Sequence, residues 1–280
     1  MKRNPVFIIL GILLGLNILA WAAVWSLRPQ GLEVTFFDVG QGDAAFIETP
    51  QNQQILIDGG PTSIILEKLG REMPFWDRTI DLIILTHPEH DHMAGLIEVL
   101  KRYQVGNILW TGVVRDTAEY KEWQKLIKEE GAKIYIAQAG QQIEGGPTSI
   151  NILYPLESLE RQESKDSNNT SIIARLVFGE NSFIFTGDAH EVVEKELIKK
   201  AVEIDSDFLK VGHHGSKTSS AEEFIKAVSP EVAVISVGRD NKYGHPAPEV
   251  LQNLSGVKIL RTDLDGDIKI ISDGKRYWEK

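Results

Sequence analysis

Residues 81–92 read DLIILTHPEHDH, and this stretch decides the fold class because it joins a buried strand to a dense group of polar side chains. The run 81–86 is almost continuously apolar, which is typical of a strand covered on both faces. The loop after it holds five side chains that can ligate a metal: His87, Glu89, His90, Asp91 and His92. Imidazole and carboxylate ligands together suit Zn²⁺, Mn²⁺ or iron. Taken alone, the loop is also compatible with a solvated turn in which Asp91 caps the following helix.

The other histidines of the chain also follow apolar strands. They occur in three further segments, at His190, at His213 and His214, and at His245, and the first 86 residues contain none. Polar side chains at the ends of several buried strands are typical of an active site along one edge of a sheet. We therefore expect the four segments to meet in space.

Two later segments add groups with their own chemistry. Asp188 follows the apolar run FIFTG, where it either bridges two cations or caps the next helix. The segment VGHHGSKTSS, residues 211–220, places a histidine pair beside Ser216, Lys217 and backbone amides that can hold a phosphate. The alternative for this segment is a glycine turn with solvated histidines.

Composition limits the class of protein. With 280 residues, 42% of them hydrophobic and 25% charged, the chain can form one large domain or two small ones. A formal net charge of −10 argues against a broad basic surface for nucleic acid, so a phosphate-bearing substrate needs a local positive centre. The chain has no cysteine, which excludes disulfides, thiolate metal sites and cysteine nucleophiles.

The N-terminal run PVFIILGILLGLNILAWAAVWSL, residues 5–27, contains no charged residue. A helix of about 20 apolar residues crosses a bilayer core of roughly 30 Å. The run therefore predicts one transmembrane helix, a membrane anchor over residues 1–30 and a single-pass membrane protein. Because Lys2 and Arg3 outweigh Arg28, residues 31–280 are expected outside the cytoplasm. The alternative is a signal peptide cleaved near 20–22, where Ala-Trp-Ala fits a cleavage site.

After this run, β-rich segments alternate with helical ones. The apolar patterns and turn residues predict helices over 92–103, 117–130, 191–202, 221–228 and 248–254. They predict strands over 32–37, 44–48, 54–57, 81–86, 108–110, 133–136, 149–153, 171–178, 182–186, 207–211, 232–237, 257–260 and 267–271. Sheets with covering helices, formed twice along the chain, predict two sheets packed face to face with helices outside.

Several motifs, taken in order, resemble the metallo-β-lactamase fold, and in particular the hydrolase domain of ComEC-type DNA-uptake (competence) proteins. They are FFDVGQGDAAFIET (36–49), LIDGG (56–60), HPEHDH (87–92), NNTSII (168–173), FTGDA (185–189), LKVGHHGSKTSS (209–220) and YGHP (243–246). Glu89 stands where that branch has an aspartate and most of the family has a histidine. The resemblance implies an α/β fold, a four-layer αββα sandwich over residues 31–280 that forms the hydrolase domain, preceded by the transmembrane helix.

The resemblance also implies a site with two divalent metal ions, Mn²⁺ or Zn²⁺. By position it assigns His87 and Glu89 to the first ion, Asp91, His92 and His213 to the second, and Asp188 to both. It predicts a part in catalysis for Asp91, His214 and His245, and substrate contacts for Asn169, Ser171, Ser216 and Lys217. Behind the ligands it predicts Asp58, Asp38 and Asp43, of which Asp58 orients a ligand histidine.

The function that the resemblance implies is a membrane-anchored hydrolase that cleaves phosphodiester bonds with a metal-bound hydroxide as nucleophile. A ComEC-like nuclease acting on single-stranded DNA is the leading form, with the membrane, single-stranded DNA and the DNA-uptake machinery as partners. Two alternatives stay open: an extracellular phosphodiesterase for a small or envelope-bound substrate, and a non-enzymatic module of an uptake complex. The net charge of −10 and the lack of a basic stripe interleaved with aromatics argue against DNA.

Overall fold

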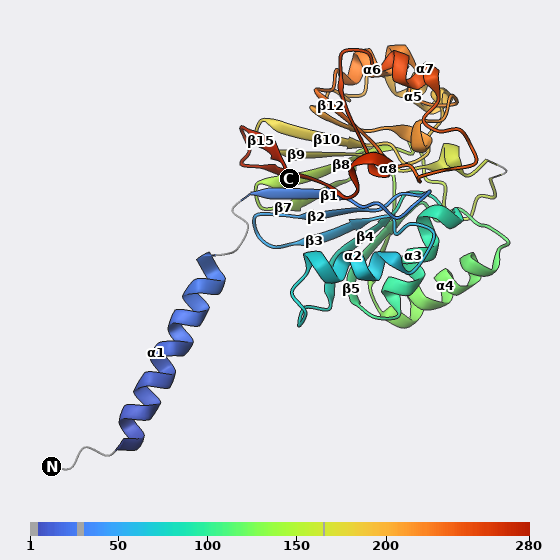
Figure 1. Cartoon of the computed structure of the whole chain (residues 1–280). Coiled ribbons are helices and arrows are strands. Elements are labelled where there is room, and N and C mark those ends of the chain that lie inside the picture. The colour runs from blue at the N-terminus through green and yellow to red at the C-terminus, as the bar shows by residue number, and fades with distance from the viewer. Residues whose placement is uncertain (1–4, 27–30, 165) are drawn as a thin grey trace. The chain divides into compact units, whose positions relative to one another are not determined.

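The computed structural model of the chain describes residues 5–26, 31–164 and 166–280 (Figure 1). It divides into two compact units, Met1–Gln30 and Gly31–Lys280. We describe each unit by itself.

The first unit contains α1 (Pro5–Ser26). Crossing a membrane takes about 20 consecutive apolar residues in one helix. Across residues 5–26, 31–164 and 166–280, no helix is both long enough and apolar enough to do so. This finding overturns two predictions, the transmembrane helix that anchors the chain and the single-pass membrane location.

The second unit contains two β-sheets. The first sheet consists of β1 (Leu32–Phe36), β2 (Ala45–Glu48), β3 (Gln54–Ile57), β4 (Thr79–Leu85), β5 (Gln104–Trp110), β6 (Lys133–Ile136), β14 (Ile268–Ser272) and β15 (Tyr277–Glu279). The second consists of β7 (Gln142–Gly145), β8 (Thr148–Tyr154), β9 (Ile173–Phe178), β10 (Asn181–Phe185), β11 (Phe208–Lys210), β12 (Val232–Ile235) and β13 (Lys258–Arg261). Their strand orders are β15-β14-β1-β2-β3-β4-β5-β6 and β13-β12-β11-β10-β9-β8-β7.

Helices cover the outer face of each sheet, and Figure 1 shows the resulting layers. The first sheet packs against α2 (Ile64–Glu72), α3 (His90–Leu100) and α4 (Ala118–Glu130), and the second against α5 (Glu191–Lys199), α6 (Glu222–Val228) and α7 (Pro248–Asn253). Shorter turns are η1 (Asn168–Thr170), η2 (Gly212–Gly215) and α8 (Thr262–Asp265). The four-layer sandwich predicted for this unit is therefore confirmed.

Three apolar clusters hold these layers together. The inner one lies between the sheets, where side chains such as Phe36, Phe183 and Ile270 alternate with outward-facing neighbours along their strands. The two outer clusters lie under the helices, with Trp123 fully buried in one and Phe224 in the other. Burial of apolar surface on both faces of each sheet explains why the strands read as continuous apolar runs.

The central strands are parallel, and this brings the ends of several strands to one edge. β3, β4 and β5 pair in parallel, as do β10, β11 and β12. Each strand is followed at its carboxyl end by a polar segment, so Asp58, His87, Asp188 and His214 come from four loops at that edge. Parallel sheets place their functional loops at this edge.

Some elements differ from the sequence-based prediction. The helix predicted over 92–103 is α3, which begins two residues earlier, at His90, and ends at Leu100. α2 was not predicted, although Ile65 and Leu69 form a buried face at helical spacing. β7 was also missed, because its sequence QIEG is polar and mostly exposed at a sheet edge, so no apolar pattern marks it.

Candidate functional site

Four side chains from three segments meet at this edge and form a group that we call the central cluster: Asp91, His92, Asp188 and His214. One ligand atom from each lies within 4.8 Å of all the others. Asp188 Oδ2 is 3.4 Å from His92 Nε2 and 3.5 Å from His214 Nε2. Asp91 Oδ2 is 3.2 Å from His214 Nε2. Two carboxylates and two imidazoles at this spacing form a set of ligands for a divalent cation.

The backbone before Asp188 sets the position of its carboxylate. Gly187 has φ +50°, and a Cβ there would lie 2.9 Å from Ser171 Cβ, so a side chain at this position would clash. The buried Ser171 hydroxyl accepts a hydrogen bond of 3.0 Å from the Asp188 amide. Ser171, predicted as a substrate contact, therefore lies behind Asp188 and fixes its backbone.

His92 contacts Asp58, the residue predicted to orient a ligand histidine. Asp58 Oδ2 lies 2.7 Å from His92 Nδ1 and also accepts a hydrogen bond of 2.7 Å from Thr86 Oγ1. Its Oδ1 accepts one of 2.8 Å from the Thr86 amide, so the carboxylate is held at both oxygens. A proton on His92 Nδ1 leaves the Nε2 lone pair directed at the central cluster.

His213 was predicted to bind the second metal ion and His214 to take part in catalysis, and both assignments stay predictions. Both have positive φ, +48° and +54°, so the usual alternation of side chains does not apply. His214 is buried in the central cluster, and its Nδ1 lies 3.0 Å from the Ser236 carbonyl oxygen. His213 is partly exposed, with Nε2 3.9 Å from Asp188 Oδ2 and Nδ1 3.0 Å from Thr218 Oγ1. The geometry favours His214 as the ligand. The partly exposed His213 lies on the solvent side of the central cluster, which we call the opening of the site.

Several ligand atoms at the cluster are buried without a hydrogen-bond partner among the described residues. They include His87 Nε2, His92 Nε2 and Asp188 Oδ1. A buried polar atom without a partner costs about 1–3 kcal/mol, so such atoms are rare unless something else binds them. His87 is fully buried beside His92, with its Nδ1 3.1 Å from Thr86 Oγ1. The residues present therefore fit divalent metal ions.

The charges of the cluster stabilise one another. Burial raises the pKa of the Asp188 carboxyl, but the His214 and His92 imidazoles outweigh it and hold that pKa well below its ordinary value. Burial lowers the pKa of His214, but Asp188 and Asp43 raise it to about 10. For His87, burial and the neighbouring His92 lower the pKa to about 3, so its imidazole is neutral and ready to bind a metal.

Glu89 is not part of the central cluster and pairs with Arg115 instead. Its Oε1 lies 2.7 Å from Arg115 Nη2 and also contacts the Ser167 hydroxyl. The neighbouring His90 is mostly exposed, with its Nδ1 3.4 Å from Glu119. The sequence-based assignment of Glu89 to the first metal ion stays a prediction, and the arrangement around Arg115 argues against it.

A buried ion pair between Lys210 and Asp43 lies behind the central cluster, and the sequence analysis did not predict it. Lys210 Nζ lies 2.6 Å from Asp43 Oδ2, and Asp43 Oδ1 lies 3.2 Å from His214 Nδ1. Lysine and aspartate are rarely this buried unless they are paired. The signal was Lys210 itself, a lone cation in the apolar run before the histidine pair. Asp43 therefore contacts His214, whereas Asp38 accepts a hydrogen bond of 3.1 Å from the Gly40 amide and closes a turn.

The remaining predicted contacts lie around the opening. Ser216 is buried, with its hydroxyl 3.1 Å from that of Thr218, while Lys217 is exposed. Asn169 accepts a hydrogen bond of 3.3 Å from the His190 amide through Oδ1. The His245 ring centroid is 6.0 Å from that of His213.

Asn168, beside the predicted Asn169, is the asparagine that faces the histidines at the opening. Its Nδ2 lies 3.3 Å from His213 Nε2 and 3.5 Å from His190 Nε2. The motif NNTSII gave no means of choosing between the two asparagines.

Comparison with known proteins supports this description of the fold and site. The model of the metallo-beta-lactamase superfamily matches residues 37–239. The chain is 34% identical over 257 residues to ComE operon protein 3 of Bacillus subtilis, covering 85% of this chain and 32% of that protein. It is 31% identical over 292 residues to Competence protein ComA of Neisseria gonorrhoeae, covering 95% of this chain and 39% of that protein. It thus spans about a third of the length of these relatives.

A solved structure shows the same fold. It is the metallo-beta-lactamase fold protein YhfI from Bacillus subtilis, with a TM-score of 0.59 and 16% identity, covering 89% of this chain and 100% of that chain. Proteins of this fold bind divalent metal ions, and the central cluster has the residues for such binding. The chain therefore belongs to the metallo-beta-lactamase superfamily and is a metallo-hydrolase of that family.

Proposed function

We propose that this chain is a metal-dependent phosphodiesterase that cleaves single-stranded DNA, as a nuclease of the ComEC type. The observation that carries the proposal is the central cluster, in which buried ligand atoms of His92 and Asp188 have no hydrogen-bond partner among the described residues. When bound there, divalent cations attract a phosphodiester and lower the pKa of a water molecule, which is the chemistry of phosphate ester hydrolysis. Similarity to two competence proteins supports DNA as the substrate.

In this proposal the chain's own residues have three tasks. His87, Asp91, His92, Asp188 and His214 hold two metal ions. Asp58 and the Lys210–Asp43 pair orient the ligand histidines from behind. At the opening, the partly exposed His213 and the Asn168 amide donate hydrogen bonds to phosphate oxygens.

His245 is our choice for the group that protonates the leaving oxygen. Its ring is partly exposed and lies beside His213, and its buried Nδ1 has no hydrogen-bond partner among the described residues. His214, the other residue predicted for catalysis, has both ring nitrogens in contact with Asp43, Ser236 and Asp91. A general acid must reach the substrate, which favours His245 over the buried His214.

The net charge of −10 favours a second candidate, a phosphodiesterase for a small substrate. A long nucleic acid gains affinity from many phosphate contacts, and an acidic chain offers few of them. A small phosphodiester needs only the local positive charge of the metal ions. The chain spans only about a third of the length of its competence relatives. A part in DNA uptake is therefore a proposal too, and it goes with the nuclease rather than with the small-substrate enzyme.

The test uses the full chain, stripped of metal with a chelator and reloaded separately with Mn²⁺ or Zn²⁺. Four substrates are assayed side by side: bis(p-nitrophenyl) phosphate, labelled single-stranded DNA, the same DNA as a duplex, and a chromogenic β-lactam. We expect metal-dependent cleavage of the small diester and of single-stranded DNA, with the duplex cut more slowly. Cleavage of the small diester alone would support the second candidate. Cleavage of neither ester, with metal bound, would overturn both and favour a non-enzymatic module.

A further inference from the structure

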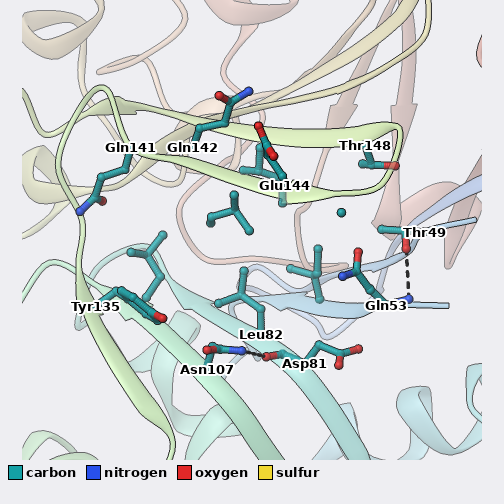
Figure 2. Close-up of a pocket in the computed structure, with 15 residues that line it drawn as sticks. Thr49, Gln53, Asp81, Leu82, Asn107, Tyr135, Gln141, Gln142, Glu144 and Thr148 are labelled. Carbon is teal, nitrogen blue, oxygen red and sulfur yellow. Dashed lines mark hydrogen bonds between the residues drawn. The ribbon is translucent and has the colours of Figure 1, made fainter. Parts of the chain in front are cut away.

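A cavity of about 470 Å³ lies between the two sheets and is separate from the central cluster (Figure 2). On β3 it is lined by Ile55, next to the amino end of the strand, and on β4 by Leu82, at the middle of the strand. The same strands reach the central cluster at their carboxyl ends. From Leu82 to Thr86 the chain rises about 13 Å, at roughly 3.3 Å per residue. The cavity is thus a different site from the metal centre.

The inner lining of this cavity, which we call its floor, is apolar and is formed by residues of both sheets. Figure 2 shows the β7–β8 hairpin facing β3, β4 and β5 across the space, and the floor is formed by Ile55, Leu82, Leu109, Ile143 and Ile150. The cavity lies beside β6 and β7, the last strands of their sheets. Its volume is within the range of about 300–1,000 Å³ that is usual for small-molecule pockets.

The hairpin end of the cavity is closely packed. Gly145 lies against the Gln53 side chain, and a Cβ at Gly145 would be 2.0 Å from Gln53 Oε1. The turn that carries Gln53 is itself fixed, since the Gln53 amide donates a hydrogen bond of 3.0 Å to Thr49 Oγ1. This end of the cavity therefore has a defined shape.

The rim is polar and carries only negative charge. Its two charged residues are Asp81 and Glu144, both exposed, and no lysine, arginine or histidine is among the described residues that line the cavity. Asp81 Oδ2 accepts a hydrogen bond of 2.8 Å from the Gln54 amide, and the Asp81 carbonyl accepts one of 2.9 Å from Asn107 (Figure 2). Within the described part of the chain, neither carboxylate forms an ion pair. The rim therefore repels anions, including the phosphodiester substrate.

We propose that this cavity binds an organic monocation with an apolar body, of the alkylammonium class. The apolar floor removes the hydrocarbon part from water, and Asp81 and Glu144 attract the ammonium group. The amides of Gln53 and Asn107 supply hydrogen-bond acceptors on the same rim. A phosphate-bearing molecule is rejected because it meets two carboxylates and no compensating cation.

The experiment titrates octylammonium, 1-octanol and octanoate separately into the full chain by isothermal calorimetry. These probes share one hydrocarbon tail and differ in charge. We expect one octylammonium per chain, bound at least tenfold more tightly than octanol, and no measurable binding of octanoate. Absence of octylammonium binding at millimolar concentration, or octanoate binding with equal affinity, would overturn the proposal.

Variants locate the binding. Asp81→Asn combined with Glu144→Gln is expected to reduce octylammonium affinity to that of octanol. The matched control, Asp116→Asn combined with Glu157→Gln, removes two exposed carboxylates outside the cavity and is expected to leave affinity unchanged. Ile143→Trp places a large side chain in the cavity and should abolish binding of both probes. Unchanged octylammonium binding in the first variant would contradict the site.

Discussion

His92 Nδ1 lies 2.7 Å from Asp58 Oδ2, and both side chains are almost completely buried. Asp58 comes directly after β3, whereas His92 lies on α3, so the contact joins two segments 34 residues apart. Asp58 has φ +58°, which directs its carboxylate back toward Thr86 and His92. The contact fixes the ring of His92 before any metal binds, because the proton on Nδ1 is held by the carboxylate.

The first prediction concerns this contact. Asp58→Asn replaces the carboxylate with an amide that holds the His92 ring less strongly. We expect Mn²⁺ affinity to fall about 10- to 100-fold, with the fold retained. Competition against a metal-binding dye measures the affinity, and circular dichroism checks the fold. Unchanged affinity would mean that Asp58 does not orient the ligand.

The second prediction concerns the Lys210–Asp43 pair. Lys210→Met leaves the Asp43 carboxylate buried without its cation, and breaking such a pair typically costs about 3–5 kcal/mol of folding free energy. Urea unfolding measures the loss. Lys226→Met, which removes an exposed lysine paired with Glu222, is the matched control and should leave the midpoint unchanged. Equal midpoints for the two variants would refute a structural role for Lys210.

The third prediction separates Glu89 from the metal ligands. Because Glu89 pairs with Arg115, Glu89→Gln should bind as many Mn²⁺ ions per chain as the unmodified protein. Asp188→Asn should bind fewer, since Asp188 lies in the central cluster. Elemental analysis after gel filtration gives the stoichiometry. Loss of one ion in Glu89→Gln would restore Glu89 as a ligand, as the sequence resemblance implied.

The fourth prediction concerns Glu194, a buried carboxyl on α5. Burial raises its pKa to about 7, although it accepts hydrogen bonds from the Ser220 and Ala221 amides. A carboxyl whose pKa is higher in the folded state binds its proton more tightly there, so stability falls as pH rises from about 4.5 to about 7. The free energy of unfolding falls by about 3 kcal/mol over this range, because each unit of difference between the folded and unfolded pKa is worth about 1.4 kcal/mol.

Glu194→Gln removes this titration. Urea unfolding of the metal-free protein at pH 5 and pH 8 gives the comparison, and the difference between the two values should shrink in the variant. An identical pH dependence in both proteins would show that Glu194 does not titrate in this range.

The sequence predicted two sheets packed face to face because strands and polar loops alternate along it, whereas the site residues were assigned from the resemblance and stay predictions. The apolar run before His87 is β4, and the strands predicted over 171–178 and 182–186 are β9 and β10, which pair antiparallel. Asp58 was predicted to orient a ligand histidine; its carboxylate lies 2.7 Å from His92 Nδ1, and its part in metal binding stays a prediction.

Other features depend on backbone geometry that a single sequence does not specify. His213 and His214 both adopt positive φ, which decides which ring enters the central cluster. Glu89 turns to Arg115, a residue 26 positions away that no local pattern links to it. The apolar run at 5–27 predicted a membrane crossing, which the structure does not support in residues 5–26, 31–164 and 166–280.

The most direct test of the central claim is the hydrolysis of bis(p-nitrophenyl) phosphate by the full chain and by Asp188→Asn, each measured after chelation and again with Mn²⁺ restored. The account predicts that Mn²⁺ restores activity in the unmodified chain and that Asp188→Asn loses at least 100-fold in kcat/KM while its fold is unchanged. The control Asp116→Asn, which changes an exposed carboxylate outside the cluster, should match the unmodified chain. Full activity in Asp188→Asn, or activity that survives chelation, would contradict the assignment of a metal-dependent phosphodiesterase to this cluster.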